Sequence, residues 1–313
     1  ATFYAVDIET GEIATSQRLS GFDTVWAITA GSDGKIYFGA TANGNLYRYD
    51  PDTKQIENLG KNPGGTWIWD LDAGKDGKLY GGTYPTGEMF EYDIAAGEFK
   101  YLGVLKEGQQ YVRGTGVSDD YAYGGTGAFA YLYKFDRKTY TKTQIPLPID
   151  GQETMVSNIW NYNGLLFIAY GTSLIIMDEA SGTIKQHLYW QDPFTFDGMI
   201  SPPSPYDNHL IYFRGKNDNY LYTYNTATDE FSATGITLPA ETMKAMNWVT
   251  LSSGETVLVM VTGSAKYAIY NPVDNTLETY STSVDMQGVS VNSMEIGPDG
   301  KIYLGGYQGS YSI

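Results

Sequence analysis

Polar residues stand at the starts of successive strand-like runs, at positions that recur along the chain. Inner strands of repeating sheet proteins favour small or apolar residues, so polar groups there indicate either a ligand site or hydrogen bonds to one another and to trapped water. The sequence leaves both interpretations open. The residues expected to ring one end of a central channel are Asp70, Arg113, Asn158, Asp197, Asn247 and Asn292.

Aromatic and cationic side chains are expected beside this polar ring, in neighbouring positions or in loops that return to the same face. Sugars bind through stacking on aromatic rings combined with a few placed hydrogen-bonding groups. An arginine there suits a carboxylated sugar, because its guanidinium pairs with a carboxylate through two hydrogen bonds. For any single tyrosine, packing within a strand is the alternative explanation. The candidate residues are Trp69, Tyr84, Phe129, Trp190, Tyr307, Arg113, Arg214 and Lys216.

The same residues allow two kinds of catalysis. A lyase acting on a uronate needs a base, for which Tyr84 is the candidate, and a group that neutralises the carboxylate, for which Arg113 or Arg214 is the candidate. A glycosidase needs two carboxylates across the scissile bond, and Asp70 and Asp197 are the candidates. Whether the protein is an enzyme stays open.

Other chemistries are excluded by composition. The chain has no Cys and only two His, so disulfides, thiolate metal sites and His-rich zinc or copper sites are not expected. His187 and His209 are expected at the surface, away from the predicted site. Asn217–Asn219 lacks the regular ligand spacing of a dedicated calcium loop, and no phosphate-binding loop occurs. We therefore predict no cofactor and no metal.

The elements that must position these residues are short strands in a repeat. Gly31–Tyr37, Gly74–Tyr80 and Gly297–Tyr303 share an Asp-Gly turn between two apolar runs, which is a strong signal for a hairpin. A second marker is an Asp or Asn that follows an apolar or aromatic residue and opens a turn through its side chain. These markers are separated by 43, 43, 43, 42, 47 and 46 residues and are Asp7, Asp50, Asp93, Asp136, Asp178, Asn225 and Asn271.

Seven such units, each with about four strand-like runs, predict an all-β seven-bladed β-propeller with four-stranded blades. Residues 1–21 supply only the end of a blade, and residues 289–313 supply only its beginning. We expect the two ends of the chain to complete the last blade together, which makes residues 1–313 a single domain.

The repeat resembles kelch-type propellers. The resemblance is carried by Tyr80-Gly81-Gly82, Tyr123–Gly125, Leu304–Gly306 and Tyr49–Thr53, although the Trp that kelch repeats place a few residues later is absent. The chain is equally similar to divergent propellers of bacterial secreted and surface proteins that process glycans. This resemblance implies a secreted or cell-surface location.

Charge and hydropathy limit the partners. The 36 acidic residues against 20 basic ones give a net charge of −16, which disfavours binding to nucleic acid and to anionic membranes. The apolar runs are strand-sized, far below the roughly 20 residues that span a bilayer. Together with the predicted site, this leads us to expect a protein that binds a carbohydrate or other small ligand. We expect it to be a monomer or part of a longer chain. A polysaccharide lyase or glycosidase and a protein-interaction scaffold are the alternatives.

Overall fold

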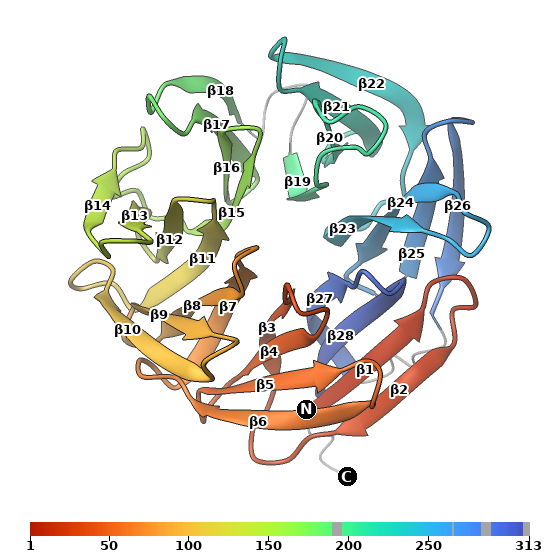
Figure 1. The fold of residues 1–313 in the computed structure, drawn as a ribbon. Helices are drawn as coiled ribbons and strands as arrows, with labels where there is room; N and C mark the ends of the chain where they lie inside the picture. The colour runs from red at the N-terminus through yellow and green to blue at the C-terminus, as the bar shows by residue number, and fades with distance from the viewer. Residues whose placement is uncertain (190–195, 265, 283–288, 309–313) are drawn as a thin grey trace. The chain divides into compact units, whose positions relative to one another are not determined.

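The computed structural model describes residues 1–189, 196–264, 266–282 and 289–308. Every regular element in these ranges is a β-strand, and the strands form seven four-stranded antiparallel sheets (Figure 1). The fold is a seven-bladed β-propeller, as the repeat predicts. Within the described ranges, no helix is long and apolar enough to cross a membrane.

The chain divides into two compact units. Unit 1 consists of Ala1, Arg18–Asn161 and Leu166–Gly171, and unit 2 consists of Thr2–Gln17, Tyr162–Leu165 and Thr172–Ile313.

Unit 1 holds the sheets β3 to β6, β7 to β10 and β11 to β14, with most of β15 and β16. Its strands are β3 (Val25–Ala30), β4 (Ile36–Ala40), β5 (Asn45–Asp50), β6 (Gln55–Lys61), β7 (Trp67–Ala73), β8 (Lys78–Tyr84), β9 (Glu88–Asp93), β10 (Glu98–Val104), β11 (Tyr111–Val117), β12 (Tyr121–Gly127), β13 (Leu132–Asp136), β14 (Lys142–Ile145), β15 (Val156–Tyr162) and β16 (Leu165–Tyr170).

Unit 2 holds β17 and β18, the sheets β19 to β22 and β23 to β26, and the sheet with the order β2-β1-β28-β27. Its strands are β1 (Thr2–Asp7), β2 (Ile13–Arg18), β17 (Ser173–Asp178), β18 (Ile184–Leu188), β19 (Phe196–Ile200), β20 (Leu210–Gly215), β21 (Tyr220–Asn225), β22 (Glu230–Thr237), β23 (Met243–Thr250), β24 (Thr256–Thr262), β25 (Lys266–Asn271), β26 (Thr276–Ser281), β27 (Val289–Ile296) and β28 (Lys301–Gln308).

The predicted turns of the repeat are present in the structure. Gly34, Gly77 and Gly300 have φ values of 76°, 81° and 70°, the left-handed conformation that an Asp-Gly hairpin turn needs. All seven Asp and Asn markers accept a hydrogen bond on the side-chain oxygen from a backbone N–H two or three residues later, at 2.7–3.2 Å. The predicted role of these markers is confirmed.

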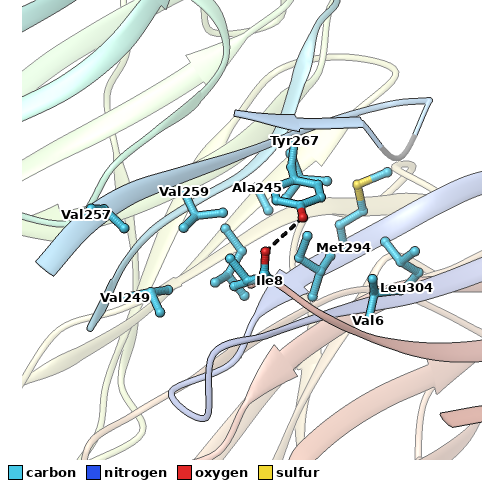
Figure 2. Close-up of a cluster of buried hydrophobic side chains, with 12 residues drawn as sticks. Val6, Ile8, Ala245, Val249, Val257, Val259, Tyr267, Met294 and Leu304 are labelled. Carbon is cyan, nitrogen blue, oxygen red and sulfur yellow. Dashed lines mark hydrogen bonds between the residues drawn. The ribbon is translucent and has the colours of Figure 1, made fainter. Parts of the chain in front are cut away.

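The last blade is closed by strands from both ends of the chain, as predicted. β1 pairs antiparallel with β28 over Thr2–Asp7. The apolar face of this blade packs on the sheet β23 to β26. The shared cluster includes Val6, Leu304 and Val259, all essentially buried (Figure 2). The hydroxyl of Tyr267 donates a hydrogen bond of 2.8 Å to the carbonyl oxygen of Ile8 in the same cluster (Figure 2).

A β-bulge interrupts the first strand of several blades at the same register. In unit 1 the extra residue is Trp26 in β3, Trp69 in β7 and Arg113 in β11. In unit 2 it is Lys244 in β23 and Asn292 in β27. A bulge re-aims the side chain of the extra residue, and bulges are common beside functional sites.

Glycines in the second strands let neighbouring blades of unit 1 approach closely. A Cβ on Gly39 would lie 2.4 Å from Cβ of Ile68, one on Gly82 would lie 2.7 Å from Cγ1 of Val112, and one on Gly125 would lie 2.3 Å from Cγ1 of Val156. Ile68 and Val112 directly precede the bulge residues of their strands. The recurring Gly-Gly pairs therefore set the distance between the strands that carry the bulges.

Replacement of Gly82 with alanine is expected to lower the free energy of unfolding by about 2 kcal/mol, because the new methyl group overlaps both Cγ1 and the carbonyl oxygen of Val112. Chemical denaturation followed by intrinsic fluorescence measures the loss. Gly263→Ala is the matched control, since its Cβ would meet only the flexible side chain of Lys244 at 3.6 Å. Equal stability of the two variants would contradict the role assigned to Gly82.

A buried polar network joins the second and third blades of unit 1. Glu91 on β9 is 3% exposed, and its carboxylate accepts hydrogen bonds from Lys78 Nζ at 2.6 Å and from the Tyr80 hydroxyl at 2.9 Å. The Tyr140 hydroxyl, from the turn after β13, donates to the same carboxylate at 3.1 Å. The guanidinium Nε of Arg137 donates to the Tyr80 hydroxyl at 3.0 Å. Every member is partnered, as a buried charge requires.

Candidate ligand-binding site

The bulge residues of three successive blades of unit 1 form a stacked row. The rings of Trp26 and Trp69 lie 4.9 Å apart at an interplanar angle of 11°. The guanidinium carbon of Arg113 lies 5.2 Å from the centroid of Trp69, which is the distance of a cation–π contact. The row exists because the same bulge directs these three side chains from their strands.

Three more aromatic residues extend this row. Trp67, two positions before Trp69 in β7, stacks on it at 5.7 Å. Tyr84 is the cross-strand partner of Trp67, and it stacks on Tyr111, the first residue of β11, at 4.4 Å. Both tyrosines meet Trp69 edge to face, at 5.9 and 5.2 Å. We call this group the aromatic site; its members are all half-buried and are Trp26, Trp67, Trp69, Tyr84, Tyr111 and Arg113.

Two hydrogen-bond donors of the aromatic site lack acceptors. The indole N–H groups of Trp26 and Trp69 are buried and have no acceptor among the described residues. A buried donor without a partner costs about 1–3 kcal/mol, and such donors are rare in folded proteins.

Arg113 brings an unneutralised cation to the site. Burial lowers the pKa of its guanidinium, and the nearby negative charge of Asp70 opposes this, so the group stays protonated at neutral pH. No carboxylate in the described ranges lies within ion-pair distance of it. Asp70 is instead held by the backbone N–H and the hydroxyl of Thr115 in β11, at 2.6 and 3.1 Å. The guanidinium therefore remains available to an anionic ligand.

Two carboxylates lie next to each other along β7, at Asp70 and Asp72. Burial raises the pKa of Asp70, although the hydrogen bond from the Thr115 N–H and the charge of Arg113 oppose the rise. Burial also raises the pKa of Asp72 to about 7, against a hydrogen bond from the Ala73 N–H, and the negative charge of Asp70 adds to the rise. Asp72 therefore exchanges its proton near neutral pH.

The pKa of Tyr111 is raised by burial and by the adjacent Tyr84. At neutral pH Tyr111 therefore carries its proton and acts as a hydrogen-bond donor. This suits contacts with the hydroxyl and carboxylate oxygens of a ligand.

The structure brings four of the predicted site residues together, namely Trp69, Asp70, Tyr84 and Arg113. Phe129 lies in the loop after β12 of the same unit and is 44% exposed. Its backbone N–H donates to the side-chain oxygen of Gln109 at 3.1 Å.

The described members of the predicted polar ring stand at different positions relative to the bulges of their strands. Arg113 stands at a bulge, whereas Asp70 follows the bulge of its strand. Asn247 lies three residues after the bulge of β23, where its side chain donates to the Ile296 carbonyl at 3.1 Å and accepts from the Trp248 N–H at 2.8 Å. Asn158 is half-buried in β15.

Arg214 is not an exposed cation. It is 4% exposed in β20 and donates a hydrogen bond to the side-chain oxygen of Asn219 in the following hairpin. Burial lowers the pKa of its guanidinium.

Four predicted site residues lie wholly or partly outside the described part of the chain. Trp190 falls in the undescribed residues. Asp197, Asn292 and Tyr307 belong to strands β19, β27 and β28, but their side chains are outside the description.

The histidines lie outside the aromatic site. His187 is in β18, where Nδ1 lies 2.9 Å from the Tyr189 hydroxyl, and His209 is exposed before β20. In the loop Asn217–Asn219, the Asp218 carboxylate accepts hydrogen bonds from the Tyr220 N–H and the Tyr222 hydroxyl. Among the described residues, no three His, Cys, Asp or Glu side chains gather as metal ligands.

Sequence reasoning missed four contributors, which are Trp26, Trp67, Asp72 and Tyr111. A signal for one of them was present: Trp26 lies 43 residues before Trp69, which is the period of the turn markers, and Arg113 follows Trp69 after 44 residues. An alignment of the repeats would have shown that the residues that follow Val25, Ile68 and Val112 occupy equivalent positions in three blades. The missing information was the bulge that turns these side chains toward one another.

No protein-family model and no curated protein matches the sequence. Among solved structures, the chain is similar to a streptogramin B lyase, with a TM-score of 0.72, 15% identity and 97% of each chain covered. It is also similar to a catalytically inactive histidine-to-alanine variant of virginiamycin B lyase from Staphylococcus aureus with quinupristin (TM-score 0.69, 15% identity, 97% of this chain and 99% of that one). A chain of the mitotic checkpoint complex matches at a TM-score of 0.69 and 13% identity, covering 98% of this chain and 91% of that one. At these identities the likeness shows the fold, a β-propeller, and that fold serves proteins with unrelated functions.

Proposed function

We propose that the protein is a secreted or cell-surface propeller that binds an acidic carbohydrate at the aromatic site. The observation that carries this proposal is Arg113, a cation without an ion-pair partner among the described residues, which lies against the face of Trp69. A carboxylate on a sugar would pair with the guanidinium while the sugar ring contacts the neighbouring aromatic faces.

The aromatic site has the composition that sugar recognition uses. Its five aromatic side chains provide apolar surface, and the hydroxyls of Tyr84 and Tyr111 provide polar groups at the edge of that surface. The guanidinium of Arg113 adds a donor of paired hydrogen bonds that suits a carboxylate. An uncharged apolar ligand would leave this guanidinium without a partner.

A polysaccharide lyase at the same site is the second candidate. Tyr84 stacks on Tyr111 and lies beside Trp69, which contacts Arg113, so a phenol and a carboxylate-neutralising cation occur in one cluster. One of the solved neighbours is described as inactive after replacement of a histidine, whereas the aromatic site contains no histidine. The lyase candidate therefore rests on the tyrosines and is independent of that neighbour's activity.

The test is titration calorimetry with oligosaccharides of galacturonate, mannuronate and glucuronate, and with their neutral methyl esters. The wild type is expected to bind at least one acidic series more tightly than its ester. Arg113→Gln should weaken binding of the acid about 30-fold and leave the ester almost unchanged, because the change removes one charge-assisted interaction. Arg48→Gln, which alters a half-buried cation that is already paired with Glu57, is the matched control and should not affect binding.

Product assays on the same mixtures separate the two candidates. Absorbance of unsaturated uronate reports a lyase, and new reducing ends report hydrolysis. Binding without either product would reject an enzyme for those glycans. A wild type that binds no member of the panel would contradict the proposed function itself.

A further inference from the structure

The cations of this acidic protein are concentrated in the part of the sequence that contains Arg113 of the aromatic site. Residues 100–142 contain seven Lys and Arg against four Asp and Glu, whereas the whole chain carries a net charge of −16. This stretch comprises the end of β10, the connection to β11, and the strands β11 to β13. Part of this charge lies away from the aromatic site, because Arg137 and Lys138 bond to the β11–β12 hairpin at Ser118, Asp119 and Asp120. Arg113 and Lys106 are the cations of the stretch that we consider for an anionic ligand.

The cations of this stretch are held against aromatic rings. In the described part of the chain, every cation–π contact takes its cation from residues 100–142. Lys106 is one of them, with Nζ 4.6 Å from the ring centroid of Tyr131. Several other cations of the stretch are already bound: Lys138 pairs with Asp120, and Lys142 donates to the carbonyls of Val104 and Leu105.

Contacts between loops connect Lys106 to the aromatic site. Gly87, three residues after Tyr84, accepts a hydrogen bond on its carbonyl from the Leu105 N–H at 2.9 Å. The Gln109 N–H donates to the Lys106 carbonyl at 3.1 Å, which folds the connection to Tyr111 back on itself. Three loops of unit 1, which are residues 84–88, 105–111 and 127–131, therefore form one continuous surface.

Phe129 is an exposed aromatic residue on this surface. The Gln109 side chain receives the Phe129 N–H at 3.1 Å, and Phe129 is 44% exposed. Phe129 belongs to the same loop as Tyr131, the ring under Lys106. The surface therefore carries an exposed aromatic ring in the loop that holds the Lys106 contact.

We infer that the ligand is an extended acidic oligosaccharide, with one carboxylate at Arg113 and another at Lys106. The inference rests on the proposed function and adds a second subsite to it. The sugar that binds at Arg113 stacks in the aromatic site, the following sugars cross Tyr84, Tyr111 and Phe129, and the second anion reaches Lys106. Two linked contacts raise affinity because the second binds from a high effective concentration.

The experiment is a chain-length series of oligouronates from the same three sugars, from dimer to octamer, titrated into the wild type and into Lys106→Gln and Arg113→Gln. Wild-type affinity should rise about tenfold or more between the shortest and longest oligomers. Lys106→Gln should remove this rise while leaving affinity for the dimer unchanged. Arg113→Gln should weaken binding at every length. Lys138→Gln, a change in an exposed lysine of the same stretch, should match the wild type throughout.

The outcomes separate the second subsite from the first. Affinity that is independent of length, or a Lys106→Gln variant that keeps the full length dependence, would overturn the inference and leave the proposed function standing. A wild type that binds no oligomer would overturn both. A Lys138→Gln variant as weak as Lys106→Gln would assign the effect to net charge and also reject the second subsite.

Discussion

Replacing Trp69 with alanine is expected to weaken glycan binding more than 100-fold and to lower the free energy of unfolding by about 3 kcal/mol. Trp69 is the centre of the aromatic site: its ring contacts Trp26, Trp67, Tyr84 and Tyr111. It also carries the guanidinium of Arg113 on its face, so its removal leaves that cation without support. Calorimetric titration measures the binding loss, and urea denaturation measures the stability loss.

Two further variants keep the Trp69 experiment interpretable. Trp69→Phe retains a flat ring and is expected to restore most of the stability and part of the binding. Trp248→Ala removes a half-buried tryptophan of β23 whose indole N–H donates to the Pro202 carbonyl at 3.0 Å. It should destabilise the protein comparably and leave glycan affinity unchanged. Similar affinity losses in Trp248→Ala and Trp69→Ala would mean that the effect comes from general destabilisation.

Glu91→Ala is expected to lower the free energy of unfolding by about 3 kcal/mol. The carboxylate is buried and is the shared acceptor for Lys78, Tyr80 and Tyr140, so its loss removes the anion that pairs with Lys78 and the acceptor of both hydroxyls. Burial lowers the pKa of Lys78, but the hydrogen bond and charge of Glu91 outweigh it, and the net shift is upward. The raised pKa of the lysine therefore contributes stability through neutral pH, and this contribution is lost as pH rises through that pKa.

Glu57→Ala is the matched control for Glu91. Glu57 pairs with Arg48, but its side chain is 59% exposed, and exposed ion pairs contribute at most about 1 kcal/mol. Urea denaturation at low and high salt should show a small, salt-sensitive loss for Glu57→Ala and a large loss for Glu91→Ala that salt hardly changes. Equal losses would contradict the role of the buried network.

The fold could be predicted from sequence because its signals are local and repeated. Asp50, Asp93 and Asp136 each open a turn through a hydrogen bond between residues two or three apart, so the marker acts wherever it occurs. The glycines of the Asp-Gly turns act equally locally through their φ angles. Seven copies of the same turn-forming marker predict seven blades. The closure of the last blade by β1 and β28 followed from counting the strands that each end supplies.

The candidate site could be predicted only in part. Trp69, Asp70, Tyr84 and Arg113 were assigned to one region from their positions in the repeat, and the structure brings them together. Arg214 was chosen on the same grounds, yet it is buried and bonded to Asn219. Repeat position predicts the strand end at which a residue stands. It does not predict whether the side chain is enclosed by its own hairpin.

The all-β repeat, the number of blades and the lack of thiol chemistry follow from the residues alone, because each depends on residue type or on contacts between near neighbours in the chain. Closure by both ends follows from the number of strands that each end supplies. Which side chains meet depends on the folded structure. The single-residue bulges at Trp26, Trp69 and Arg113 direct three side chains toward one another, whereas the spacing in the sequence shows only that their positions are equivalent. The close approach of Gly82 to Val112 then places two of those side chains, from separate blades, in contact. Side-chain direction and the distance between blades arise from packing across the sheets, which is a property of the folded chain as a whole.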